Sequence, residues 1–125
     1  MLKLEDFQAA KKRVDEVILP THLIHSDAFS EECGNDVYIK PENLQKTGAF
    51  KIRGAYNKIM KLDDEAKKKG LIASSAGNHA QGVAYAAKKL GVKATICMPV
   101  HTPLIKVDDT KAHGADVVLY GEAYD

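Results

Sequence analysis

Apolar and polar positions follow two patterns along this chain, short apolar runs and longer amphipathic stretches. Short, mainly apolar runs of strand length occur at residues 37–40, 71–74, 93–98 and 116–120. Longer amphipathic stretches of helical spacing occur at 4–18, 48–62 and 80–90 and before residue 113, with shorter helices expected at 27–32 and 63–69. This alternation predicts an α/β fold: a parallel sheet with flanking helices.

The start of the predicted helix at 48–62 carries the first candidate chemistry. Thr47 is a suitable N-cap, which places Lys51 in or just past the first turn. A cation is disfavoured there by the helix dipole, and partial burial beside Phe50 would add desolvation. Both effects lower the pKa of a lysine and make Lys51 a candidate amine nucleophile for Schiff-base chemistry. The alternative is an ordinary surface lysine.

A second candidate lies at residues 75–82, where a predicted strand turns into a helix. Helix starts at the carboxyl ends of parallel strands bind anions through free N–H groups, and small residues let the ligand approach the backbone. Ser75 and Asn78 offer further hydrogen bonds. The alternative is a plain turn capped by Asn78.

Other function classes find little support. The net charge of +1 gives no reason to expect a nucleic-acid partner, and no apolar run has the length of a membrane span. Neither a signal peptide nor a disulfide between Cys33 and Cys97 is expected, which favours a cytoplasmic location. Phosphate-loop and dinucleotide motifs are missing, and the histidines have no metal-site spacing, while a Ser-His-Asp arrangement stays open.

Residues 40–55 and 74–82, with Met98-Pro99, Lys106-Val107 and 114–119, closely resemble the fold-type II enzymes that depend on pyridoxal 5'-phosphate. Among these enzymes the threonine ammonia-lyases (threonine dehydratases) are the most similar. The matching stretches follow the family's order and spacing and cover nearly the whole chain. The resemblance turns Lys51 from one surface lysine among many into the expected cofactor lysine.

The resemblance implies a role for each motif residue. Lys51 would hold the cofactor as a Schiff base and act as the base at the substrate Cα, with Phe50 against the cofactor ring and Asn78 bonded to its phenolic oxygen. Ser75 and the backbone amides of Ala76, Gly77, Asn78 and His79 would receive the substrate carboxylate. L-threonine or L-serine would then give a 2-oxo acid and ammonia.

The resemblance also implies how the chain is organised. Residues 1–45 would belong to a larger domain and 46–125 to a smaller α/β domain, in the N-terminal part of a homo-oligomeric enzyme whose phosphate-binding loop lies beyond Asp125. Two alternatives remain: a non-catalytic α/β fragment or assembly module, and a serine racemase-like enzyme. Ala76 stands where the racemases carry a serine on the opposite face of the cofactor, which favours the lyase.

Overall fold

The computed structural model describes residues 1–123, which form a three-stranded parallel sheet, a set of helices and a projecting arm. The sheet has the order β3-β4-β5, with β3 Leu71–Ser74, β4 Ala94–Met98 and β5 Asp116–Leu119. The helices are α1 Leu4–Val14, α2 Asp27–Cys33, α3 Lys51–Met60, α4 Asp64–Lys69, α5 Asn78–Lys89 and α6 Leu104–Ala112, with a 3-10 turn, η1, at Glu42–Leu44. The predicted α/β class with a parallel sheet and flanking helices is therefore confirmed.

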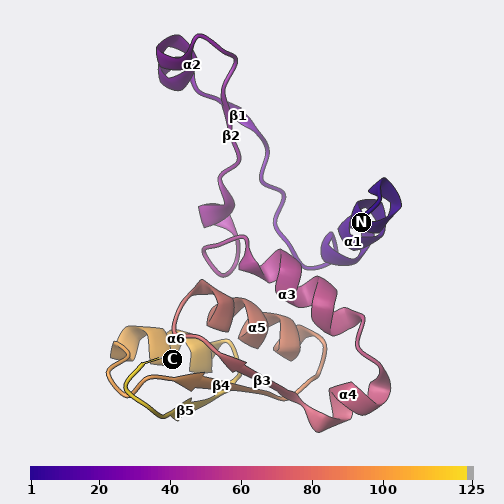
Figure 1. The fold of residues 1–125 in the computed structure, drawn as a ribbon, viewed down its shortest axis with the longest axis vertical. Coiled ribbons are helices and arrows are strands. Elements are labelled where there is room, and N and C mark those ends of the chain that lie inside the picture. The colour runs from indigo at the N-terminus through magenta and orange to yellow at the C-terminus, as the bar shows by residue number, and fades with distance from the viewer. Residues whose placement is uncertain (124–125) are drawn as a thin grey trace.

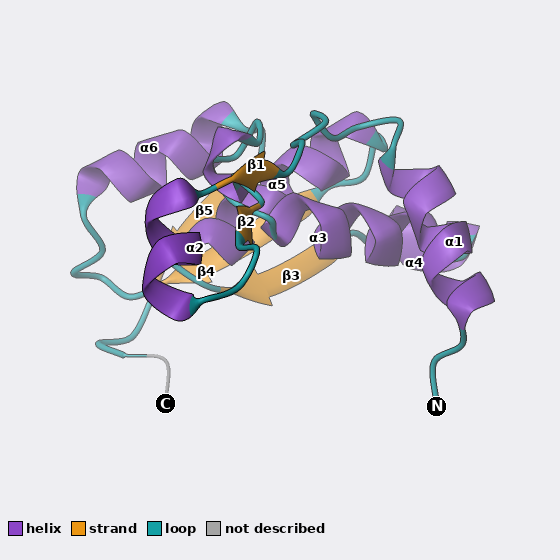
Figure 2. Cartoon of the chain, turned by 90° about the horizontal axis from the view of Figure 1, so that it is seen from above, coloured by secondary structure: helices purple, strands orange, loops and turns teal. Residues whose placement is uncertain are grey.

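Helix α5 is the centre of the fold. It lies between the sheet and α3, and α6 lies beside it (Figure 1). Seen from above in Figure 2, the helices α3, α5 and α6 cover the strands. Small residues dominate the buried positions of α5, and Ala80, Ala84 and Ala86 are at most 1% exposed. Because these side chains are short, α3 and the sheet can both approach the backbone of α5 closely.

Residues 24–39 form an arm that projects from this body (Figure 1). Strands β1 (Ile24–His25) and β2 (Tyr38–Ile39) pair antiparallel, and α2 sits at the tip. The prediction of a loop before α2 was wrong at β1, because a strand of two residues is too short to show a period. Glycine ends α2 as expected: Gly34 adopts φ 65° at the C-cap, a conformation that favours glycine.

Most other predicted elements are found close to their expected limits, with one clear exception at the N-terminus. Helix α1 ends at Val14, four residues before the expected end at Ile18. The chain tightens there, since the N–H groups of Val17 and Ile18 both bond to the carbonyl of Val14. Val17 lies outside the helix but is only 3% exposed, so its apolar side chain is still buried in the core.

A polar cluster ties the base of the arm to α3. Arg53 donates two hydrogen bonds to Glu42, at 2.9 Å and 2.7 Å, and Thr21 donates a third at 2.7 Å. The hydrogen bonds from Arg53 are the main cause that lowers the pKa of Glu42 from 4.5 to about 2. Burial acts in the opposite direction, and the hydrogen bond from Thr21 lowers the pKa further. Nearby, the Gln45 side chain bonds both to the N–H and to the carbonyl of Leu19. These bonds hold the segment that leads into α3.

We expect the Glu42–Arg53 pair to stabilise the fold above pH 4.5. Because the folded pKa lies below the unfolded value, this stabilisation is complete above about pH 4.5 and is lost as the pH falls towards 2. Glu42→Gln should therefore lower the unfolding free energy by roughly 1–3 kcal/mol at pH 7, where it leaves Arg53 without its partner. Urea unfolding at pH 7 and pH 3 measures this, with Glu31→Gln on the exposed side of α2 as the control. An equal loss at both pH values would contradict it.

Candidate active site

The candidate site begins where β3 ends at Ser74. Residues 75–77 turn the chain, and α5 starts at Asn78 with Gly77 as its N-cap. The Ser75 N–H bonds to the Cys97 carbonyl at 3.1 Å, which fixes the turn on the end of β4. The Ser75 hydroxyl accepts the Gly77 N–H at 3.3 Å. The alternative of an Asn78 cap is wrong, because Asn78 is the first helical residue and is exposed.

Lys51 is the first residue of α3, so its expected place in the first turn is confirmed. Thr47 does not cap this helix: Phe50 is the N-cap residue, without a side-chain bond. Gly48 adopts φ 66°, a left-handed conformation that does not occur within a right-handed α-helix, so α3 can start only after Gly48. The Thr47 hydroxyl lies 3.5 Å from the Ala49 carbonyl and donates to it.

The expected burial of Lys51 beside Phe50 was wrong. Phe50 is 57% exposed and Lys51 is exposed as well. The Lys51 Nζ lies 5.1 Å from the centre of the Phe50 ring, within the range of a cation–π contact. The aromatic ring and the amine therefore lie together on an open surface, while the next residue, Ile52, is buried.

Gly82 on α5 brings Lys51 to the second motif. A Cβ atom on Gly82 would lie 3.1 Å from the carbonyl carbon of Lys51 and 3.2 Å from its Cβ. The backbones of α3 and α5 therefore touch at this point, one turn into the helix that starts at Asn78. The start of α3 therefore lies against α5 one turn after residues 75–77. From the sequence, Gly82 was expected only as a part of the motif at residues 75–82, because its role depends on a contact between helices.

The charges around this site are arranged unusually. Helices α1, α2 and α4 carry acidic residues in their first turns, as the helix dipole favours. Helices α3, α5 and α6 have none, and the first turn of α3 begins with Lys51. Free N–H groups and partial positive charge at these three helix starts suit an anionic ligand.

An open hollow of about 360 Å³ lies at the turn, lined by Ser74, Ser75, Ala76, Gly77 and Lys106. Lys106 on α6 lies in a stretch that resembles the family, but the sequence alone did not predict it as a site residue. Its place in the first turn of α6, a turn that has no acidic residue, was the signal that could have found it. The His79 side chain, in contrast, lines a separate hollow with Gly54 and Lys58 of α3, so only its backbone belongs to the turn.

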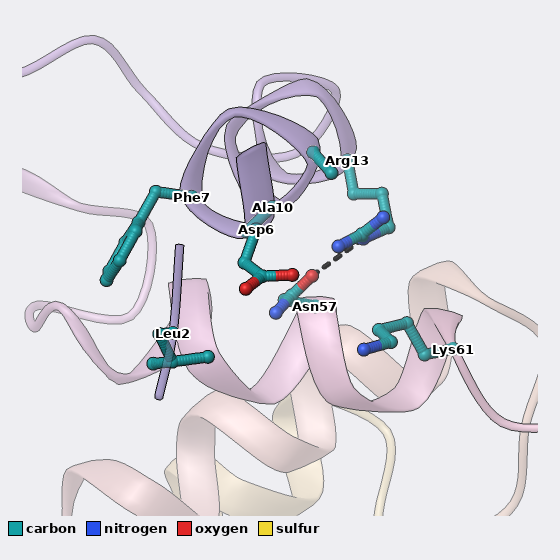
Figure 3. Close-up of a pocket in the computed structure, with 8 residues that line it drawn as sticks. Leu2, Asp6, Phe7, Ala10, Arg13, Asn57 and Lys61 are labelled. Atoms are coloured by element: carbon teal, nitrogen blue, oxygen red, sulfur yellow. Dashed lines mark hydrogen bonds between the residues drawn. The ribbon is translucent and has the colours of Figure 1, made fainter. Parts of the chain in front are cut away.

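Other polar groups lie away from this site. A hollow of about 370 Å³ lies between α1 and α3, where Arg13 donates to the Asn57 side chain at 2.7 Å. Figure 3 draws the residues that line it, and none of them is a predicted site residue. On the arm, His25 lies 3.1 Å from the Ser30 hydroxyl and 2.9 Å from Asp27. These contacts have the order of a Ser-His-Asp arrangement, and the Ser30 hydroxyl also accepts the Val37 N–H at 2.9 Å, so they tie α2 to the hairpin.

Residues 1–123 contain no group of three or more His, Cys, Asp or Glu side chains placed to hold a metal ion. No helix within this range is both long and apolar enough to cross a membrane.

The fold and the site together define an α/β protein with an exposed lysine at the start of α3, which lies against α5, and with a strand-to-helix turn suited to an anionic ligand. The sequence profile of the pyridoxal-phosphate dependent enzymes matches residues 14–125, and the chain belongs to this family. The predicted family membership and the cofactor class of the family are thus confirmed.

Similar proteins agree with this assignment. The L-threonine ammonia-lyase of Thermotoga maritima is 51% identical over 125 residues, which are 100% of this chain and 31% of that protein. A serine racemase structure from Dictyostelium discoideum has a TM-score of 0.91 at 38% identity, covering 98% of this chain and 40% of the other. Threonine deaminase isoform 2 of Solanum lycopersicum has a TM-score of 0.84 at 40% identity, covering 98% and 35%. The chain spans about a third of the length of these relatives.

Proposed function

We propose that this chain carries the lysine-bearing part of a pyridoxal 5'-phosphate-dependent ammonia-lyase that deaminates L-threonine or L-serine. In the net reaction the Cβ–O bond of the substrate breaks and the hydroxyl leaves as water. Water then adds back and ammonia departs, which leaves the 2-oxo acid. The observation that carries the proposal is the contact at Gly82, which sets Lys51 against α5 one turn after residues 75–77.

The residues of the site fit such a cofactor and substrate. When bound, the cofactor supplies an electron sink for the bonds at Cα. The exposed Lys51 amine would hold it in a Schiff-base linkage and, once released, move the Cα proton, with Phe50 against the ring and Asn78 at its phenolic oxygen. Ser75 and the amides of residues 76–79 would bind the substrate carboxylate, for which the acid-free start of α5 is suited.

The wider organisation follows from the same proposal. Residues 1–45 would form part of a larger domain and residues 46–125 most of a smaller one, in a homo-oligomer located in the cytoplasm. The projecting arm supports the division, because it extends away from the sheet and its helices (Figure 1). The free cysteines Cys33 and Cys97 support the location, since reducing compartments keep thiols unpaired.

A serine racemase-like enzyme is the second candidate, favoured by the similarity to the Dictyostelium structure. Racemisation needs a proton donor on each face of the cofactor. Ala76 has no group that can serve, which supports the lyase. The third possibility, a non-catalytic assembly module, predicts no reaction at Lys51.

Cofactor trapping tests the three candidates. The intact protein is incubated with pyridoxal 5'-phosphate, reduced with borohydride and digested, and peptide mass spectrometry then locates the modified lysine. A lyase gives a stoichiometric adduct at Lys51 and releases 2-oxo acid from L-threonine. A racemase gives the adduct, with D-serine formed from L-serine as the main product. Absence of an adduct at Lys51 would overturn the proposal.

A further inference from the structure

We propose that Lys106 is a second anchor for the substrate carboxylate, opposite the turn at residues 75–77. This inference rests on the proposed function and assigns to α6 a part of the binding site. The family motifs considered above place the carboxylate on the turn alone.

The topology brings Lys106 to the turn. Strands β3 and β4 are parallel neighbours with Ser74 paired to Cys97, so both strands end at the same edge of the sheet. The turn after β3 is bonded to Cys97. The segment after β4 leads into α6, where Lys106 is the third residue, and α6 packs beside α5. Lys106 and the turn therefore line one hollow from two sides.

Lys106 forms no ion pair among residues 1–123, like every described lysine except Lys11 and Lys40. It also lies in the first turn of α6, where the helix dipole disfavours a cation. Asp109, one turn further along α6, accepts a bond from Gln81 at 3.5 Å. A cation that shares a hollow with the free N–H groups at the start of α5 suits an anionic ligand.

The turn supplies donors that complement this cation. The Ser75 hydroxyl accepts from Gly77, so its own proton is free to donate to a ligand. The first N–H groups of α5 have no partner inside the helix and point out from its start. A carboxylate in the hollow would receive neutral donors from α5 and a charge-assisted bond from Lys106, which is the stronger kind.

The chemistry predicts which kinetic constant Lys106 controls. The substrate carboxylate keeps its charge throughout the reaction, so Lys106 binds the substrate and the transition state equally well. Loss of such uniform binding raises KM and leaves kcat unchanged. Lys51, which moves the proton, should affect kcat instead.

The kinetic experiment uses the intact protein loaded with pyridoxal 5'-phosphate and L-threonine. Lys106→Met should raise KM roughly tenfold, the effect of losing one charge-assisted bond at an open site, with kcat within about twofold. Lys106→Arg should restore most of the affinity. Lys111→Met, at an exposed lysine in the last turn of the same helix, is the control and should change neither constant. An unchanged KM in Lys106→Met, or an equal rise in Lys111→Met, would overturn the proposal.

A measurement without the cofactor separates this inference from the proposed function. Sodium propionate is titrated into the cofactor-free protein while the amide resonances of Ser75 and Gly77 are followed by NMR. Lys106→Met should weaken propionate binding roughly tenfold, and Lys111→Met should not. If Lys51 gives no cofactor adduct but propionate binding depends on Lys106, the proposed reaction fails while the anion site stands. Propionate binding that is equal in all variants would overturn the role of Lys106.

Discussion

Replacing Lys51 by alanine should abolish turnover of L-threonine by the intact protein. A positioned general base alone contributes roughly 10²–10⁴ in rate, and Lys51 would also hold the cofactor. We therefore expect kcat to fall by at least roughly a thousandfold in Lys51→Ala. The borohydride-stable adduct should disappear from the peptide that carries residue 51. Steady-state assay of 2-oxo acid release and peptide mapping measure the two losses.

Lys58→Ala is the matched control for this variant. Lys58 is exposed on the same helix, two turns further on, and lines a hollow away from the turn at residues 75–77. It should retain both the adduct and the turnover. Full activity in Lys51→Ala, or equal losses in the two variants, would show that the contact between α3 and α5 does not carry the chemistry.

Gly82→Val should be the most destabilising single change at the contact between α3 and α5. The space for a Cβ is bounded at 3.1–3.2 Å by backbone atoms of Lys51 and Ile52, which cannot rotate away as a side chain can. Overpacking of this kind costs roughly 1–3 kcal/mol, and the β-branched side chain adds further crowding. We expect the unfolding free energy to fall by about 2 kcal/mol or more. Displacement of Lys51 should in addition lower kcat by up to roughly a hundredfold.

The same substitution at Gly54 separates crowding from helix propensity. Gly54 lies within α3, and a Cβ atom there would meet nothing within 4 Å. Gly54→Val should change the unfolding free energy by no more than about 0.5 kcal/mol, since both glycine and valine are weak helix formers. Chemical denaturation of both variants measures the difference. If Gly82→Val and Gly54→Val have the same unfolding free energy, the close contact at Gly82 does not limit the packing of α3 on α5.

Local sequence patterns were sufficient for most of the architecture. Apolar runs of strand length identified β3, β4 and β5, and helical spacing identified α3 and α5, because these elements each bury one continuous face. The family resemblance pointed to Lys51 and to the turn at Ser75 from residues that are close together in the chain. Their placement on neighbouring helix starts agrees with that interpretation.

The features that were missed depend on tertiary contacts or on backbone conformation. Thr47 has the side chain of a cap, but the positive φ of Gly48 moved the helix start to Lys51. The exposure of Phe50 could not be read from its apolar character. Lys106 comes close to the turn at residues 75–77 only because α6 packs beside α5. Gly82 comes close to Lys51 only because α3 packs against α5.

The contact between α3 and α5 at Gly82 also links ligand binding to folding. Lys51 and Asn78 belong to different helices, so a ligand that touches both binds only the state in which α3 is docked on α5. Such a ligand stabilises the docked state by an amount that grows with the logarithm of its concentration above the dissociation constant. The cofactor would thus act as a tertiary clamp between two helices, in addition to its part in the chemistry.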